Sequence, residues 1–152
     1  MENLYSARNS IYCYPGTSTL INKLDIHDSN KLFNLERQIV LAKSFILRQN
    51  VKNYGFDKQH FLGIHKFLFE DLYPFAGKTR TENISKGEFT FANWEFIDEQ
   101  LDYLLNKLKS ENYLEDLSKE DLSKRLAFYL SELNVRHPFR EGNGRTIREF
   151  IR

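Results

Sequence analysis

The chain has 152 residues and a formal net charge of +1, which results from 22 basic and 21 acidic side chains. This length suffices for a single domain with a hydrophobic core, and the balanced charge predicts neither a nucleic acid nor an anionic membrane as a partner. The single cysteine excludes an internal disulfide, and neither a membrane-spanning apolar run nor a secretory signal is visible, so we expect a cytoplasmic protein.

Residues 1–27 are expected to form an irregular arm that packs on the rest of the domain, because a proline-glycine turn interrupts them. Asp28 or Ser29 can cap a helix that runs to about Asn50. The apolar side chains expected on the buried face of this helix are Leu32, Leu35, Ile39, Ala42 and Ile46.

A second helix is expected after a break at residues 53–56, with Asp57 as its N-cap. The side chains expected on its buried face are Phe61, Ile64, Leu68 and Leu72. His60 and His65 lie five residues apart and do not share a helix face. We therefore interpret both as ordinary helix residues and not as a metal-binding pair.

Residues 79–92 carry the only strand signal of the chain. Phe89 and Phe91 alternate with polar residues and follow the turn-like pair Lys86-Gly87, which predicts a short β-hairpin. A hairpin on a helical body leaves an unpaired edge, which a target peptide can join as an added strand; a plain surface hairpin is the alternative. The residues expected to form this docking edge are Ile84, Ser85, Lys86, Gly87, Glu88 and Phe89.

Two further helices are expected beyond the hairpin. Asn93 is predicted to cap a helix over residues 94–109. Ser118 starts a sequence that resembles a capping box, and the helix behind it delivers His137 to the following loop. No repeat or linker interrupts the chain, so the sequence predicts one all-α domain with a single hairpin, whose helical core begins at residue 28.

The twelve residues from His137 to Arg148 hold the densest group of reactive side chains. A proline and two glycines predict a loop that leads into a helix N-terminus, where inward N–H groups and the helix dipole bind phosphate. Gly142 and Gly144 allow the backbone to take positive φ values and to come close to a ligand. Arg145 and Arg148 lie three residues apart on one face of that helix, so both can bind the same anion.

Three other residues of this stretch suit a nucleotide site. His137 can accept a proton near neutral pH. Glu141 offers a hard oxygen ligand to an Mg²⁺ ion that bridges phosphate oxygens. Phe139 is expected to be an apolar wedge that fixes the loop in the core. Together these residues predict a phosphate site with a general base beside it; the alternative is a surface turn with arginines that face water.

The stretch from His137 to Arg148 resembles the signature of the Fic family, H-P-F-x-[D/E]-G-N-G-R-x-x-R, and fills every defined position. Residues 73–80 also look like the Fic segment that leads into a flap beside the active site. Fic proteins transfer part of a nucleotide, usually AMP from ATP, to a hydroxyl side chain of a target protein. The resemblance therefore implies a Fic-type helical bundle with a flap at about 79–92, ATP as substrate and Mg²⁺ as cofactor.

The resemblance also implies a role for each residue of the motif. His137 is the base that deprotonates the target hydroxyl, and Glu141 holds Mg²⁺. The residues implied to bind the nucleotide phosphates are Gly142, Asn143, Gly144, Arg145 and Arg148. Because Fic domains usually carry further helices beyond the motif helix, we expect the C-terminal helices of the domain to be missing from residues 1–152.

Two other functions stay open at this point. A Doc-like protein phosphotransferase uses the nucleotide in the reverse orientation, but that branch tends to have lysine where this chain has Gly144. A catalytically inactive module that docks a partner through the flap is disfavoured by the complete motif. Residues 1–152 contain no match to the inhibitory pattern [S/T]-x-x-x-E-[G/N] of many Fic proteins. Inhibition is therefore expected from a small antitoxin-like protein or from a helix beyond Arg152.

Overall fold

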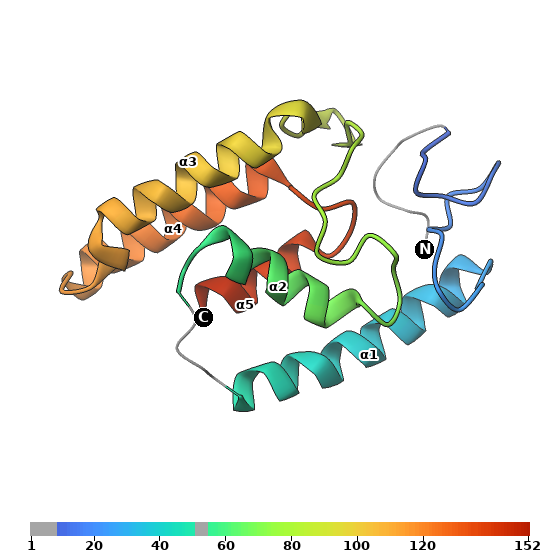
Figure 1. The fold of residues 1–152 in the computed structure, drawn as a ribbon, viewed down its shortest axis with the longest axis horizontal. Helices are drawn as coiled ribbons and strands as arrows, with labels where there is room; N and C mark the ends of the chain where they lie inside the picture. The colour runs from blue at the N-terminus through green and yellow to red at the C-terminus, as the bar shows by residue number, and fades with distance from the viewer. Residues whose placement is uncertain (1–8, 51–54) are drawn as a thin grey trace.

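The computed structural model describes residues 9–50 and 55–152, which form a helical bundle with one short hairpin (Figure 1). Residues 1–8 of the predicted arm and residues 53–54 of the predicted break lie outside these ranges. The elements are α1 (Ser29–Gln49), α2 (Lys58–Phe69), β1 (Ser85–Lys86), β2 (Phe89–Thr90), the 3₁₀ turn η1 (Trp94–Phe96), α3 (Ile97–Ser110), the 3₁₀ turn η2 (Asn112–Leu114), α4 (Lys119–Arg136) and α5 (Asn143–Ile151). The prediction of an all-α fold with one hairpin is confirmed.

Helix α5 lies at the centre of the bundle, where it packs against α2 and α4. Helix α1 runs along α2 on one side, and α3 and α4 form an antiparallel pair on the other (Figure 1). The core is aromatic: the ring of Phe61 lies 5.4 Å from that of Phe139 and 5.2 Å from that of Phe150. The loop before α5 is therefore anchored in the core. Within the described ranges, no helix is both long enough and apolar enough to cross a membrane.

Local sequence signals set where the helices begin. The side chains of Asp28, Asp57 and Ser118 each accept a hydrogen bond from a backbone N–H three residues later, which satisfies one of the N–H groups that a helix start leaves unpaired. These three predicted caps are confirmed. Asn93 also caps, but it caps the 3₁₀ turn η1, so α3 begins at Ile97 and not at residue 94.

The buried face of α1 differs from the predicted one. The prediction is wrong for Ala42 and Ile46, which are exposed. The buried side chains follow one another at four-residue intervals and are Leu32, Glu36, Val40 and Ser44. This face can hold a carboxylate because Glu36 meets an arginine and a tyrosine hydroxyl from other parts of the chain. Leu32 is buried as predicted and Ile39 packs against the core, so apolar spacing alone identifies only part of the buried face.

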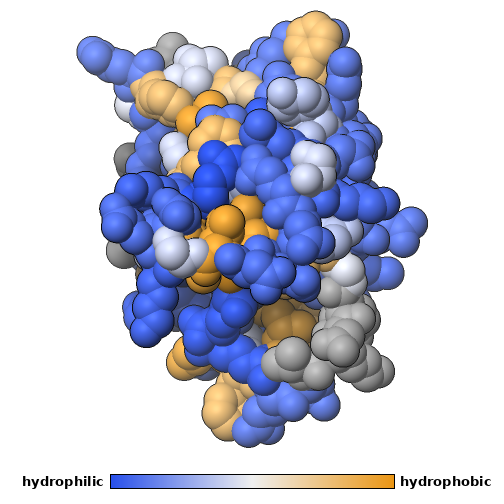
Figure 2. Space-filling view, turned by 90° about the vertical axis from the view of Figure 1, so that its left-hand side faces the viewer, coloured by the Kyte–Doolittle hydropathy of each residue, from blue (hydrophilic) through white to orange (hydrophobic). Residues whose placement is uncertain are grey.

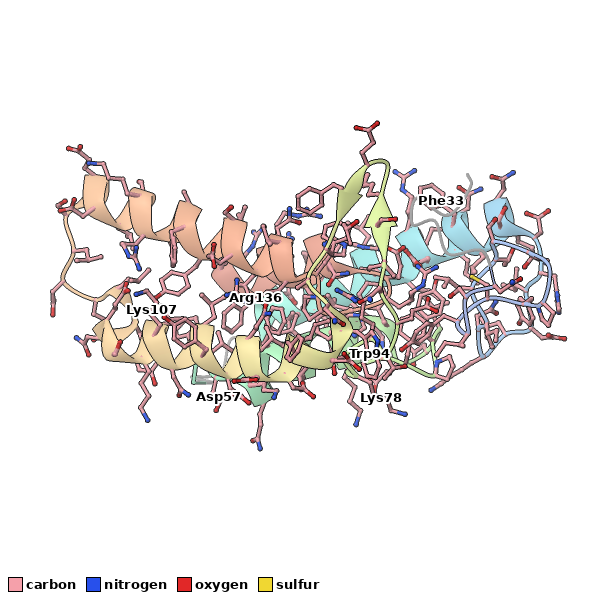
Figure 3. All side chains as sticks on the ribbon, turned by 90° about the horizontal axis from the view of Figure 1, so that it is seen from above. Phe33, Asp57, Lys78, Trp94, Lys107 and Arg136 are labelled. Atoms are coloured by element: carbon pink, nitrogen blue, oxygen red, sulfur yellow. The ribbon has the colours of Figure 1, made fainter. Side chains whose placement is uncertain are left out.

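The hairpin formed by β1 and β2 projects from the helical body, as Figure 3 shows. Its antiparallel register pairs Ser85 with Thr90 and Lys86 with Phe89. The turn therefore consists of the two residues between the strands, of which Gly87 has a φ of +58° and needs the conformational freedom of glycine. The predicted hairpin is present, with its turn one residue later than expected.

The end of the molecule that lies on the left in Figure 1 is mostly hydrophilic, with hydrophobic side chains in a recess near its centre (Figure 2). A groove of about 570 Å³ lies between α1 and α2, and Ile46, Leu47, Ile64 and Phe67 are among the residues that line it. No residue of the stretch from His137 to Arg148 lines this groove, so it is separate from the site described next.

Candidate active site

The loop between α4 and α5 is fixed at Phe139, which is bound both to the start of α5 and to the core. The side-chain amide of Asn143, the first residue of α5, accepts a hydrogen bond from the N–H of Phe139 (2.8 Å) and donates one to its carbonyl oxygen (2.7 Å). The Phe139 ring is fully buried and stacks on His65, with centroids 3.7 Å apart. Phe139 thus has the position expected of an apolar wedge, and the remaining loop residues are held between the core and α5.

His137 follows α4 in a left-handed conformation, with a φ of +46°, and only 6 % of it is exposed. Its Nδ1 lies 3.1 Å from the carbonyl oxygen of Asn134. Because a carbonyl oxygen only accepts, Nδ1 carries the proton and the basic lone pair is on Nε2. Burial, with a smaller contribution from the charges of Arg80 and Lys86, lowers the pKa of His137 to about 4. The imidazole is therefore neutral at physiological pH, as a general base must be.

Gly142 precedes α5 with a φ of +81°, and its N–H donates to the carboxylate of Glu141 (2.8 Å). A Cβ atom here would lie 2.3 Å from Cζ of Phe69, so only glycine fits. Gly144 lies inside the first turn of α5 and does not take the positive φ that glycine allows, because the helix has already begun. A Cβ atom on Gly144 would lie 3.2 Å from Nη1 of Arg148, so this guanidinium folds back over the first turn.

Arg145 is held between two carboxylates. Its Nη2 lies 2.6 Å from Oε1 of Glu36 and 3.3 Å from Oε1 of Glu141, and its guanidinium lies over the ring of Phe69. Glu36 is buried, and it also accepts a hydrogen bond from the hydroxyl of Tyr73. Both motif arginines therefore gather at the N-terminal turn of α5, where the helix dipole already favours an anion.

Glu141 is the residue expected to hold Mg²⁺. Burial raises the pKa of its carboxyl, and the neighbouring charge of Glu36 raises it further. Two carboxylates that share one arginine favour the approach of another cation. Mg²⁺ commonly takes one or two protein carboxylates and completes its coordination with phosphate oxygens and water. The chemistry of this side chain therefore fits a magnesium ion that arrives with a nucleotide.

Residues 55–152 match the family model described as Fic/DOC family. The chain belongs to the Fic/DOC family. It is 40 % identical over 147 residues to the protein adenylyltransferase VbhT of Bartonella schoenbuchensis, and 35 % identical over 148 residues to the probable protein adenylyltransferase y4lH of Sinorhizobium fredii. Each alignment covers 97 % of this chain, but 31 % of VbhT and 76 % of y4lH.

Solved structures of Bartonella effector proteins agree with the fold. The crystal structure of BepC from Bartonella tribocorum with bound AMPPNP superimposes with a TM-score of 0.86 at 30 % identity, over 92 % of this chain and 74 % of that one. A Fic domain from Bartonella quintana with bound ADP gives a TM-score of 0.83 at 28 % identity, over 92 % and 72 % of the two chains. The Fic-type helical bundle implied by the motif is confirmed.

The hairpin of this Fic domain lies beside His137, because the ring of Phe91, just after β2, stacks on the imidazole with centroids 3.9 Å apart. Phe89 is exposed, as are the two turn residues and Lys86. Of the other two predicted docking residues, Ser85 is half-buried and Ile84 is buried. Ile84 lies where the hairpin joins the bundle, so its side chain is not part of an exposed edge.

Three side chains with central positions in this site were not predicted from the sequence to have a role in it: His65, Glu36 and Arg80. Nδ1 of His65 accepts a hydrogen bond from the N–H of Gly77 (2.8 Å), so Nε2 donates to the carbonyl oxygen of Glu141 (2.9 Å). His65 is thus an anchor of the motif loop and not merely an ordinary helix residue. Its spacing gives no signal of this role, because the loop residue that it binds is 76 positions away.

Stability of the domain is expected to depend on pH through these histidines. Burial lowers the pKa of His65, like that of His137, to about 4, against about 6.5 in an unfolded chain. Between these values the unfolded state binds more protons, so the stabilisation is complete above pH 6.5 and is lost as the pH falls toward 4. Urea unfolding should give a free energy about 2 kcal/mol lower per buried histidine at pH 5 than at pH 7.

The exposed histidine His27 provides the control for this measurement, because its imidazole is 60 % exposed and pairs with Asp25 at the surface. The variant His27→Ala should keep the same difference in unfolding free energy between pH 7 and pH 5. Equal free energies of unfolding at the two pH values in the unmodified chain would contradict the buried neutral state of the two histidines.

Glu36→Ala is expected to lower the free energy of unfolding by about 2–4 kcal/mol. The substitution removes the acceptor of the buried Tyr73 hydroxyl and the closest anionic partner of Arg145. The matched control is Glu120→Ala in α4, because Glu120 pairs with Lys124 at an exposed site (2.7 Å) and should cost less than about 0.5 kcal/mol. If urea unfolding gave equal losses of unfolding free energy in the two variants, the buried contacts of Glu36 would stabilise the fold no more than an exposed ion pair does.

Proposed function

We propose that this Fic domain transfers AMP from ATP to a Tyr, Thr or Ser hydroxyl of a target protein. The proposal is supported by the complete motif and by relatives that are named protein adenylyltransferases. One observation carries it: a neutral imidazole, on His137, stands on the same short loop as a helix N-terminus at which two arginines gather. Such an arrangement suits a reaction that needs both a base and a phosphate site.

In this mechanism the phosphates of ATP lie against the N–H groups at the start of α5, with Arg145 and Arg148 at the β- and γ-phosphates. Nε2 of His137 takes the proton of the target hydroxyl. The oxygen attacks the α-phosphorus in line, the bond between this phosphorus and the bridging α,β-oxygen breaks, and pyrophosphate leaves with the bond electrons. Glu141 would hold the Mg²⁺ that is bound with ATP, and the ion would supply positive charge to the phosphate oxygens.

The arginines have a second task in this proposal, which is to stabilise the leaving pyrophosphate. Arg145 is bound to Glu36 and Glu141 before any nucleotide arrives, and its guanidinium is therefore already ordered near the loop. An ordered group loses less conformational entropy on binding than a mobile one. Arg148 folds over the first turn of the same helix, and it is proposed to act together with Arg145.

The target is proposed to dock as an added strand along the exposed edge of the hairpin, between Ser85 and Phe89, which would bring its hydroxyl toward His137. A small antitoxin-like protein, or a segment outside residues 1–152, is proposed to inhibit the reaction, since the inhibitory pattern does not occur in this sequence. The single cysteine and the use of ATP favour a cytoplasmic reaction.

A Doc-like phosphate transfer is disfavoured because this chain has Gly144 at the position where that branch tends to have lysine. A side chain there would begin 3.2 Å from the guanidinium of Arg148, and a lysine would place a second cation in the same space.

Two nucleotide analogues distinguish the reactions. AMPPNP keeps the bond between the α- and β-phosphates reactive but blocks transfer of the γ-phosphate, and α,β-methylene-ATP does the reverse. The domain is expected to attach AMP to proteins of a cell lysate with AMPPNP and Mg²⁺, detected by mass spectrometry of modified peptides, and to be inactive with α,β-methylene-ATP. Phosphorylated peptides that appear with α,β-methylene-ATP only when the domain is added would overturn the proposal.

A further inference from the structure

The C-terminal end of α4 carries the base of the proposed reaction, and all of its carbonyl groups are bound. The last four carbonyls of an α-helix have no partner within the helix. Two of them accept hydrogen bonds from His137 itself: the oxygen of Leu133 from its N–H (3.0 Å) and that of Asn134 from its Nδ1 (3.1 Å). The other two are bound by the segment that contains the hairpin.

Arg80, eleven residues beyond the end of α2, provides the main contact from that segment. Its Nη2 donates to the carbonyl oxygen of Arg136 (3.2 Å), its Nε to that of His137 (2.8 Å) and its backbone N–H to that of Pro138 (2.8 Å). One residue therefore binds three consecutive carbonyl groups, at the point where the chain leaves α4 and His137 takes its left-handed conformation.

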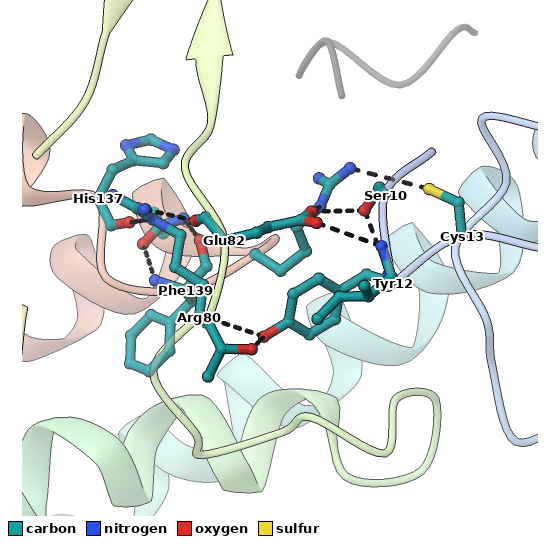
Figure 4. A network of polar contacts seen from close by, with 11 residues as sticks. Ser10, Tyr12, Cys13, Arg80, Glu82, His137 and Phe139 are labelled. Atoms are coloured by element: carbon teal, nitrogen blue, oxygen red, sulfur yellow. Dashed lines mark hydrogen bonds and ion pairs between the residues drawn. The ribbon is translucent and has the colours of Figure 1, made fainter. Parts of the chain in front are cut away.

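The same guanidinium also binds both stems of the hairpin. Nη1 donates to the carbonyl oxygen of Glu82 (2.7 Å), before β1, and Nη2 donates to that of Ala92 (2.5 Å), after β2. The N–H of Ala92 in turn donates to the carbonyl oxygen of Val135 in α4 (3.2 Å). Figure 4 shows Arg80 and Glu82 between His137 on one side and the N-terminal segment that contains Ser10 on the other.

The guanidinium of Arg80 matches its buried partners in the number and geometry of its hydrogen-bond donors. Arg80 is 1 % exposed, and burial lowers the pKa of its guanidinium to about 10. A buried cation is costly unless its donors are satisfied. Here four carbonyl oxygens, from two segments of chain, converge on the side chain. Only the planar guanidinium offers five donors in a rigid fork.

We propose that Arg80 is a positioning residue, which locks the left-handed backbone of His137 and both stems of the hairpin into one rigid arrangement. The inference rests on the proposed function, because it states why the two parts must be rigid relative to each other. A target strand on the hairpin and the base on the loop would then meet in a constant register, so that the hydroxyl reaches Nε2.

The test uses Arg80→Lys, which keeps the charge, and Arg80→Gln, which removes it. Arg125→Lys is the matched control, because Arg125 makes a two-contact ion pair with Glu111 elsewhere on α4. Four quantities are measured for each chain: hydrogen exchange of the hairpin amides, the pKa of His137 by NMR titration, the dissociation constant of Mg·ATP, and the rate of AMP transfer. Arg80 and Lys86 both oppose protonation of His137, and the lysine variant separates loss of geometry from loss of charge.

In both Arg80 variants the hairpin amides are expected to exchange faster, and the pKa of His137 is expected to rise by at least ~1 unit toward its ordinary value. The rate of AMP transfer at saturating ATP should fall about 10–100-fold, while the dissociation constant of Mg·ATP stays the same. Arg125→Lys should change none of these quantities.

The proposal would be overturned if the Arg80 variants kept the hydrogen-exchange rates of the hairpin amides and the pKa of His137 found in the unmodified chain, even if AMP transfer were slower. Loss of the fold in both variants would also overturn it, because Arg80 would then act on global packing. If the unmodified chain transfers no AMP, the proposed function fails; the exchange and pKa measurements still decide the role of Arg80.

Discussion

The variant His137→Ala is expected to lose AMP transfer by about 10²–10⁴-fold, which is the usual contribution of a general base. The neutral imidazole, with its lone pair on Nε2, is the proton acceptor proposed for the target hydroxyl. No other residue is proposed to accept that proton, whereas nucleotide binding depends on groups of α5. The dissociation constant of Mg·ATP should therefore stay close to that of the unmodified chain. Transfer is measured as AMP attached to protein.

The fold of this variant is checked by circular dichroism and urea unfolding, since the substitution also removes the stacking on Phe91. His27→Ala serves as the control, because His27 is exposed and should be dispensable for transfer. A folded His137→Ala chain that transfers AMP at the normal rate would refute the role of His137 as the base.

Among single substitutions that add one carbon atom, Gly142→Ala is expected to lower the free energy of unfolding most. The new Cβ would lie 2.3 Å from Cζ and 2.4 Å from Cε2 of Phe69, a fully buried ring, and φ at this position is +81°. Overpacking and the left-handed backbone together should lower the free energy of unfolding by about 2–4 kcal/mol. Movement of Phe69 would also displace Arg145, whose guanidinium lies 4.8 Å from the ring centroid, so transfer should fall as well.

Gly63→Ala is the matched control for this substitution. Gly63 lies inside α2, and a Cβ there meets no atom within 4 Å. Alanine is favoured over glycine in a helix interior by up to about 1 kcal/mol, so this variant should be as stable as the unmodified chain or more so. Equal urea midpoints for Gly142→Ala and the unmodified chain would contradict the close packing described for the loop.

The parts of this structure that could be predicted from the sequence are those that depend on neighbouring residues. The caps Asp28, Asp57 and Ser118 act on N–H groups three residues away. The hairpin is a local pairing of two-residue strands. The order of motif residues from His137 to Arg148 placed a loop before a helix, and the structure has both.

The parts that could not be predicted depend on partners far apart in the chain. Glu36 and Tyr73 are 37 positions apart, and Arg80 and His137 are 57 apart. Distant partners also explain why Ala42 and Ile46 of α1 were wrongly predicted to be buried. An apolar stripe predicts the buried face of a helix only where that face is apolar, and the buried face of α1 contains Glu36 and Ser44. Hydrophobic residues such as Leu41 lie on the exposed side instead.

The most direct test of AMP transfer uses ATP labelled at either the α- or the γ-phosphate. Each form is incubated with Mg²⁺, proteins of a cell lysate and either the unmodified chain or its His137→Ala variant. Because kinases of the lysate also label proteins from the γ-phosphate, the label is compared between the two chains. AMP transfer predicts that the unmodified chain adds protein-bound label from the α-phosphate only, relative to its variant. Added label from the γ-phosphate, or from neither phosphate, would contradict AMP transfer and favour a phosphotransferase or an inactive binding module, respectively.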